Sequence, residues 1–234
     1  VFKVDPLSGA LTLSGDSLKL GAGPDHRAPA FVAPEPTGHF VYVTQLAAGV
    51  QPDDGIRGYS VDQTSGELTE LPGSPFNAGN VIAGAIVFRP DGKFLFSSGN
   101  GVNAFAIGAQ GQLTLVDGSP FSTDVQSDPW APNITIDPAG KLLYVSNFGP
   151  TRHVTGFKID PISGALEQAG APVTTTSPYS LALGPGGRFL YVGEDTGEIA
   201  VFKVSRPSGQ LTALDGSPFQ FGGLEPDLAF LTLP

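Results

Sequence analysis

The stretch NITIDPAGKLLYVSNF, residues 133–148, contains the pattern on which the fold prediction depends. A short apolar run leads into a Pro-x-Gly turn, and a second apolar run with a central aromatic residue follows it. Proline and glycine two residues apart are typical of a tight turn that feeds a strand. The same turn and run recur after Pro36, Pro90 and Pro185. The stretch therefore predicts an antiparallel strand pair that is repeated along the chain.

Two further motifs follow the strand pairs in a fixed order, the second of them after three of the four pairs. The first is a strand with an aromatic centre that ends in a Gly-x-Leu turn, whose glycines are Gly9, Gly66, Gly111, Gly164 and Gly209. These glycines are 57, 45, 53 and 45 residues apart, a period in the range of propeller blades. The second motif, Gly-Ser-Pro-Phe, begins at Gly73, Gly118 and Gly216, always seven residues after the turn.

One period corresponds to four short strands, which we name A, B, C and D in chain order. Strand A precedes the Pro-x-Gly turn, strand B follows it, strand C carries the aromatic centre and strand D follows the Gly-x-Leu turn. Both faces of such a sheet are apolar because each sheet packs between two neighbours. The predicted fold class is therefore all-β, a β-propeller of four-stranded antiparallel blades.

The two ends of the chain predict a split or incomplete fifth blade. Residues 1–4 match residues 201–204 of a strand C, whereas residues 226–231 match a strand A. The single predicted domain, 1–234, divides into the blade parts 1–24, 25–77, 78–122, 123–173, 174–220 and 221–234. Either the two ends meet to form the fifth blade, or the chain is the C-terminal portion of a longer ring. A start in the middle of a blade favours missing N-terminal sequence.

The composition excludes several classes of partner. The formal net charge is −10, the pI is near 4.5 and only 12 residues are Lys or Arg, which argues against nucleic-acid binding. No apolar run approaches the length needed to span a bilayer. Without cysteine there is neither a disulfide framework nor a thiolate nucleophile. We expect no membrane span, no metal and no cofactor.

The ordered motifs resemble the lactonase-type (6-phosphogluconolactonase-like) seven-bladed β-propeller family. The resemblance covers nearly the whole chain, although the chain supplies only about five blades. It implies a seven-bladed fold and an extracytoplasmic location. The enzymatic members of that family carry Pro-His at the start of strand A, whereas the corresponding pairs here end in Ala30, Asn133, Tyr179 and Asp227. No catalytic residue therefore carries over from the family motif.

The variable face of the propeller is the predicted location of a site. The A-to-B and C-to-D turns are short and repetitive, whereas the B-to-C and D-to-A connections vary, and variable loops on a rigid scaffold carry most binding chemistry. Two pairs there suit catalysis, His26 with Arg27 and His153 with Arg152. In each pair the histidine would activate water and the arginine would stabilise an oxyanion. The alternative, which we favour, is that these are solvated loop residues.

The variable face also contains the residues of a predicted ligand-binding set: Asp128, Trp130, Asn133, Tyr179, Glu194, Asp195 and Asp227. Trp130 beside carboxylates suits sugar or cation binding, although packing of its loop against a neighbouring blade is favoured. Glu194, Asp195 and Glu198 form an acidic loop that could bind Ca²⁺ or supply an acid and a base. Because the calcium-loop spacing is missing, a solvated acidic face is favoured.

These observations favour a non-catalytic binding or scaffold propeller that engages a protein or a glycan. Its expected location is periplasmic, cell-surface or secreted. One alternative is a lactone hydrolase, which rests on the family resemblance. Another is a structural subunit of a larger extracellular assembly, in which another chain would complete the open blade.

Overall fold

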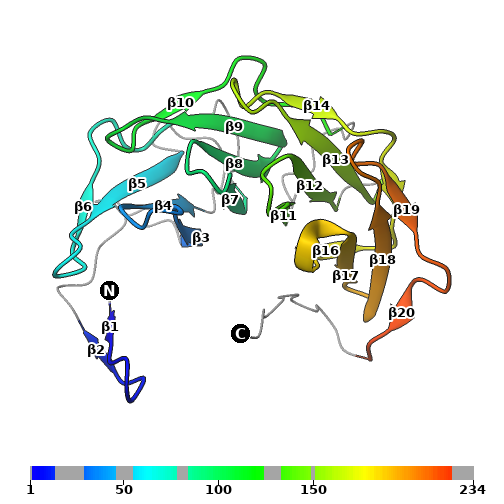
Figure 1. Ribbon diagram of the computed structural model, residues 1–234, viewed down its shortest axis with the longest axis horizontal. Coiled ribbons are helices and arrows are strands. Elements are labelled where there is room, and N and C mark those ends of the chain that lie inside the picture. The colour runs from blue at the N-terminus through cyan, green and yellow to red at the C-terminus, as the bar shows by residue number, and fades with distance from the viewer. Residues whose placement is uncertain are drawn as a thin grey trace.

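The computed structural model describes residues 2–13, 29–45, 55–77, 84–123, 133–148 and 151–222. They form four antiparallel sheets side by side in an arc (Figure 1), which we name the first to the fourth blade. The strands of the first two blades are β3 (Pro29–Pro34), β4 (Phe40–Gln45), β5 (Ile56–Val61), β6 (Leu68–Glu70), β7 (Ile86–Phe88), β8 (Phe94–Gly99), β9 (Gly101–Ile107) and β10 (Leu113–Leu115). Each sheet follows chain order, so the predicted A-B-C-D blade is confirmed.

The third and fourth blades contain one additional short strand each. Their strands are β11 (Ile134–Ile136), β12 (Leu142–Asn147), β13 (His153–Ile159), β14 (Leu166–Gln168), β15 (Val173–Thr174), β16 (Pro178–Leu183), β17 (Phe189–Glu194), β18 (Glu198–Val204), β19 (Leu211–Ala213) and β20 (Phe219–Gln220). The additional strands β15 and β20 pair with the beginnings of β13 and β18. A 3-10 turn, Pro185–Gly187, joins β16 to β17.

The N-terminal residues form the predicted C-D hairpin of another blade. Strands β1 (Phe2–Val4) and β2 (Leu11–Leu13) pair with each other in an antiparallel register. The strand A expected within residues 226–231 lies outside the described residues. The four whole blades and this hairpin therefore account for the predicted architecture as far as the structure describes it.

The core lies in the seams, by which we mean the surfaces between neighbouring blades. Because side chains alternate along a strand, β8 contributes to two seams. Phe94 and Phe96 pack in a buried cluster with Leu143 of the third blade, whereas Leu95 packs in a cluster with Tyr42 of the first blade. Strands β8 and β12 are thus buried on both faces along their whole length, as predicted for a propeller, whereas Phe189 and Tyr191 of β17 remain partly exposed.

The Gly-Ser-Pro-Phe motif fastens the end of a blade to the start of its strand C. The backbone of Phe76 exchanges two hydrogen bonds with Ile56, with N–O distances of 2.9 and 3.0 Å. Phe121 and Val102 make the same exchange in the second blade. The motif is therefore a structural part of the repeat.

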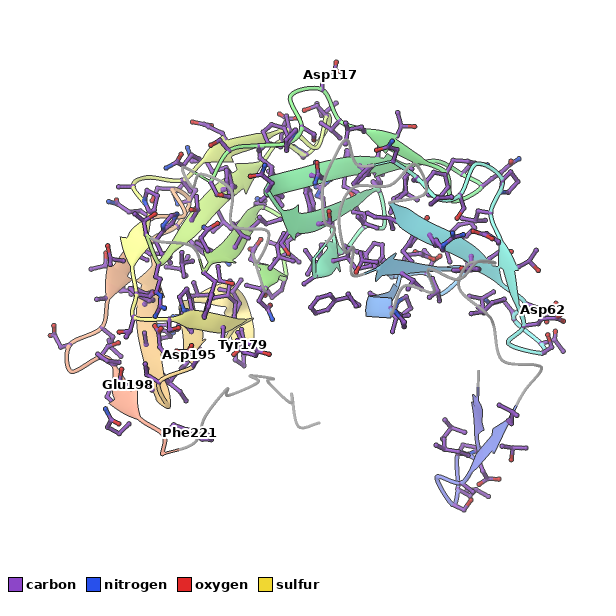
Figure 2. All side chains as sticks on the ribbon, turned by 180° about the vertical axis from the view of Figure 1, so that it is seen from behind. Asp62, Asp117, Tyr179, Asp195, Glu198 and Phe221 are labelled. Atoms are coloured by element: carbon purple, nitrogen blue, oxygen red, sulfur yellow. The ribbon has the colours of Figure 1, made fainter. Side chains whose placement is uncertain are left out.

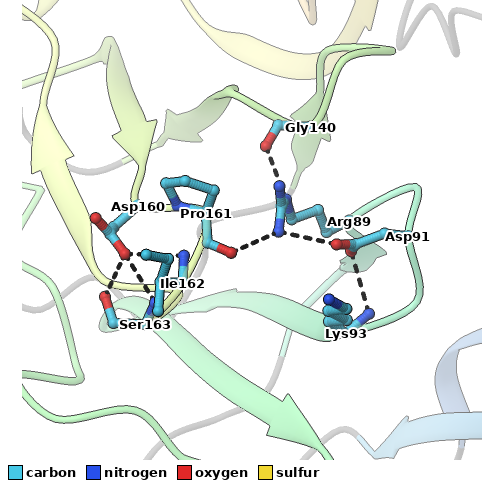
Figure 3. Close-up of polar contacts among 8 residues, drawn as sticks. All are labelled: Arg89, Asp91, Lys93, Gly140, Asp160, Pro161, Ile162 and Ser163. Atoms are coloured by element: carbon cyan, nitrogen blue, oxygen red, sulfur yellow. Dashed lines mark hydrogen bonds and ion pairs between the residues drawn. The ribbon is translucent and has the colours of Figure 1, made fainter.

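The repetitive turns lie on one face, where they join neighbouring blades. Arg89 of the second blade donates from Nε to the carbonyl of Gly140 at 3.1 Å and from Nη1 to the carbonyl of Pro161 at 3.0 Å (Figure 3). Asp91 fixes the same guanidinium with an ion pair of 2.9 Å. In the facing turn, hydrogen bonds from Ser163 lower the pKa of Asp160. These turns hold the scaffold and leave the opposite ends of the strands for a site.

Candidate functional site

The last residue of strand B reaches the variable face in every blade. Leu143 and Val145 of β12 face the second blade, so Asn147, the next residue in that alternation, faces the same seam. By the same alternation along β17, Glu194 faces the third blade. Asn147 and Glu194 therefore occupy equivalent positions in two consecutive seams.

The seam between the second and third blades contains His153 in a fully paired polar cluster. Only 7% of this histidine is exposed. Its Nε2 lies 2.9 Å from the carbonyl oxygen of Thr123, and its Nδ1 contacts the carbonyl oxygen of Thr151. Both ring nitrogens therefore lie against backbone carbonyl groups of neighbouring residues, and neither faces an open position where a water molecule could bind. This placement supports a structural role for His153 rather than that of a base.

The neighbours of His153 complete this cluster. Asn147 Nδ2 donates to Thr155 Oγ1 at 3.2 Å, and Thr155 Oγ1 donates to the carbonyl of Thr123 at 3.4 Å. Asn147 and Thr155 are both buried. Residues of two blades therefore satisfy one another across this seam.

Arg152 points away from His153 and toward the fourth blade. Its Nη1 donates to the carbonyl of Thr176 at 2.8 Å, and its guanidinium carbon lies 5.2 Å from the ring centre of Phe148. The residue is exposed. Two contacts thus fix the guanidinium beside residues 175–177, and the remaining N–H groups of its planar fork are oriented with it.

Glu194 is buried and only half paired. Its exposed fraction is 1%, and its Oε2 accepts a hydrogen bond from the backbone N–H of Ser177. Its Oε1 has no hydrogen-bond partner among the described residues, and neither have Ser177 Oγ and Thr175 Oγ1. We name Thr175, Ser177 and Glu194 the Glu194 cluster. Ser177 joins Glu194 through its backbone N–H, and Thr175 lies two residues before Ser177 in the same connection.

The environment of Glu194 favours the protonated carboxyl group. Desolvation is the largest cause and raises its pKa, and the charges of Glu198 and Asp195 act in the same direction. Hydrogen bonds from the backbone of Ser177 and Thr176 oppose this effect without reversing it. A carboxyl group with a raised pKa is a stronger base than an ordinary glutamate when it is ionised.

The rest of the acidic loop differs from Glu194. Asp195 and Glu198 are partly exposed, as expected for a solvated face, and Glu198 Oε1 accepts a hydrogen bond of 2.6 Å from Gln220. Figure 2 shows Asp195 and Glu198 on the fourth blade with Tyr179, which lies at an irregularity in the pairing of β16 with β17. The expectation of a solvated acidic loop was therefore wrong for Glu194 alone.

The other predicted site residues are distributed as follows. Asn133 is half-buried at the start of β11, where its N–H donates to Ser146 Oγ at 3.2 Å. The remaining predicted residues lie outside the described part of the chain: His26, Arg27, Asp128, Trp130 and Asp227.

Sequence reasoning missed Thr175 and Ser177. Both belong to a D-to-A connection that does not repeat, so no motif marks them. In the described ranges, no group of three His, Asp or Glu side chains is placed to hold a metal ion. No helix within those ranges has the length and apolar character to cross a membrane.

Comparisons with known proteins identify the family. A family model described as lactonase, seven-bladed β-propeller, matches residues 1–222. A 6-phosphogluconolactonase of Formosa agariphila is 33% identical over 135 residues, which are 55% of this chain and 38% of that protein. A protein of the same name from Pectobacterium carotovorum is 26% identical in an alignment of 233 positions, which covers 74% of this chain and 67% of that protein.

A solved structure has the same fold. The structure of a candidate 6-phosphogluconolactonase from Bacteroides uniformis superimposes with a TM-score of 0.79 at 19% identity, covering 94% of this chain and 65% of that one. The chain thus spans about two thirds or less of the length of these relatives. On the match over residues 1–222, this chain belongs to the lactonase family of seven-bladed β-propellers.

Proposed function

We propose that this propeller hydrolyses a lactone and that Glu194 is its general base. The observation that carries the proposal is the buried carboxylate oxygen Oε1, which has no partner among the described residues. Ser177, whose backbone N–H bonds to the other oxygen of this carboxylate, has an unpaired hydroxyl group as well. The relatives named 6-phosphogluconolactonase support the same reaction class.

The chemistry requires a water molecule next to Glu194. Because the carboxylate is almost fully buried, it acts on the substrate through that water. Glu194 Oε1 takes a proton while the water oxygen forms a bond to the lactone carbonyl carbon. The ring C–O bond then breaks, and the departing alkoxide takes the proton from Glu194. The products are the open hydroxy acid and the regenerated carboxylate.

Arg152 suits the stabilisation of negative charge in this reaction. Its guanidinium is fixed by contacts with the carbonyl group of Thr176 and the ring of Phe148. Thr176 directly precedes Ser177 in the chain. Oriented donors beside the reacting carbonyl stabilise the developing oxyanion. In this proposal Arg152 takes the catalytic role that the sequence offered as the less favoured alternative, and Glu194 replaces the histidine as the base.

The test is lactone hydrolysis by the purified protein, followed as proton release at constant pH with the spontaneous rate subtracted. The substrates are glucono-1,5-lactone and its 6-phosphate. We expect Glu194→Gln to lower kcat by about 100-fold or more, because the amide cannot accept the proton. Glu167→Gln is the matched control, since Glu167 is exposed and makes only a 3.4 Å ion pair with Lys158. A Glu194→Gln rate within threefold of wild type would contradict the proposal.

A second candidate is the non-catalytic propeller that binds a protein or glycan outside the cytoplasm. It is supported by His153, whose two ring nitrogens both lie against backbone carbonyl oxygens. Lack of turnover by the wild-type protein over a panel of five- and six-membered lactones would favour this candidate. The protein or glycan partner and the periplasmic, cell-surface or secreted location belong to this second proposal.

A further inference from the structure

The seam between the first and second blades contains a second buried polar pair, Ser97 and Asn103. They are directly opposite each other on β8 and β9, and both have an exposed fraction of 0%. Leu95 and Phe105, two residues away on each strand, pack in one cluster with Tyr42 of the first blade. By strand alternation, Ser97 and Asn103 face that same seam.

The polar atoms of this pair are unsatisfied. Ser97 Oγ, Asn103 Oδ1 and Asn103 Nδ2 have no hydrogen-bond partner among the described residues, and they do not bond to each other. A buried polar atom without a partner costs about 1–3 kcal/mol, so native proteins rarely leave three together. From this pair we infer that the seam is a binding site for an uncharged hydroxyl group.

The donor and acceptor set selects the chemistry of this ligand. The amide offers two N–H donors and one acceptor, and the hydroxyl of Ser97 can do either. A single ligand group can satisfy these atoms if it both donates and accepts hydrogen bonds, as a hydroxyl group does. The same seam contains a buried hydrophobic cluster: Tyr42, Ile56, Leu71, Phe76, Ile86, Leu95, Phe105 and Leu113. A charged ligand would lose its hydration here without a counter-charge.

The first blade does not satisfy the pair from across the seam. Thr44 is buried there, but its hydroxyl donates to the carbonyl of Gly84 at 3.0 Å. In the next seam, Val145 and Thr155 occupy the positions of Ser97 and Asn103, and Thr155 is paired with Asn147 and Thr123. The fold can therefore satisfy this position with protein atoms, and in the first seam it does not.

Two sources supply such a hydroxyl group, a buried water molecule and a polyol ligand. A buried water usually makes about three hydrogen bonds to polar groups that would otherwise be unsatisfied, which matches the three atoms here. Oxygen-17 magnetic relaxation dispersion of the whole protein counts long-lived waters. We expect the double variant Ser97→Ala/Asn103→Leu to contain about one fewer than wild type. Asn147→Leu is the matched control and should keep the wild-type number, since Asn147 is already paired with Thr155.

Sorbitol is the probe for the second source. If a polyol hydroxyl is the ligand, sorbitol lowers the number of long-lived waters in the wild-type protein and does not change that number in the double variant. If water is the ligand, sorbitol changes the number in neither protein.

A crystal structure of the wild-type protein provides a test that does not depend on folding of the variant. Density for an oxygen atom between Ser97 and Asn103 supports the site. A direct hydrogen bond between the two side chains, without a third group, overturns it, as does an equal water count in wild type and the double variant.

Discussion

Two neighbouring seams, one between the second and third blades and one between the third and fourth, contain polar residues at the same strand position. These residues are hydrogen-bonded in the first of the two seams and partly unpaired in the second. In the former, Asn147 and His153 are bound by neighbouring protein atoms. In the latter, Glu194 keeps an unpaired carboxylate oxygen. Equivalent positions in a repeat thus differ in chemistry because of what lies across the seam.

The difference depends on the non-repeating connections. Thr123 follows the Gly-Ser-Pro-Phe motif of the second blade, and its carbonyl accepts from both His153 and Thr155. In the next seam, Ser177 holds one oxygen of Glu194 with its N–H and leaves its own hydroxyl unpaired. A paired cluster stabilises the fold, whereas an unpaired one can bind a ligand or transfer a proton.

The largest expected effect comes from His153→Leu, which keeps the volume and removes both hydrogen bonds. We expect the free energy of unfolding to fall by about 2–3 kcal/mol, because the contacts of both ring nitrogens with the carbonyl groups of Thr123 and Thr151 are lost. Glu194→Gln should change it by less than about 1 kcal/mol at pH 5, since the amide oxygen can still accept from Ser177. Urea unfolding measures both values. Equal losses in the two variants would remove the distinction between the seams.

The second prediction concerns the pH dependence of lactone hydrolysis. A general base must be ionised, so the rate should rise with pH through the pKa of Glu194. Because burial raises that pKa, the acid limb should lie above pH 4.5, the ordinary value for glutamate. Below the pKa, kcat should fall by about tenfold per pH unit. A limb centred at or below pH 4.5 would exclude Glu194 as the base.

The sequence was sufficient to predict the blade. The Pro-x-Gly turn, the aromatic strand C and the Gly-x-Leu turn repeat because every blade needs the same turns and the same packing, and all four predicted blades are present. The short strands β15 and β20 were not predicted, since each pairs only two residues beyond the regular strands.

The candidate site was predictable only in part. Glu194 and Arg152 were marked by their position after strand B, but the burial of Glu194 depends on residues of another blade. Thr175 and Ser177 were missed because their connection has no counterpart elsewhere in the chain. Burial and pairing across a seam are properties of the assembled fold, and a local pattern does not contain them.

The third prediction uses protein stability to test the same carboxyl group. The folded-state pKa of Glu194 is raised, so between pH 4.5 and that pKa the folded protein binds more protons than the unfolded chain. Its contribution to stability is therefore lost as pH rises through this window, by at most about 1.4 kcal/mol per pH unit. Glu194→Gln should lack this loss and become more stable relative to wild type with rising pH. Parallel stability curves for both proteins would show that the carboxyl is not perturbed.

The smallest expected effect on stability comes from tyrosine hydrogen bonds that join neighbouring blades on the face with the repetitive turns, opposite the Glu194 cluster. Tyr144 of the third blade donates its hydroxyl to the carbonyl of Gly209 in the fourth blade at 2.8 Å. Tyr42 makes the equivalent bond of 2.7 Å to Gly111 between the first and second blades. In the remaining seam, the equivalent residue is Phe96, which has no hydroxyl. Tyr144→Phe should therefore lower the free energy of unfolding by about 1 kcal/mol.

Tyr42→Phe is the matched variant for this bond, and urea unfolding should give it a similar loss. The rate of lactone hydrolysis should be unchanged in both variants, because these hydrogen bonds lie on the face with the repetitive turns and not at the Glu194 cluster. A loss of activity in Tyr144→Phe without loss of stability would mean that the turn face and the site are coupled through the fourth blade. The bond would then position β17, and the two faces of the propeller could not be treated as separate.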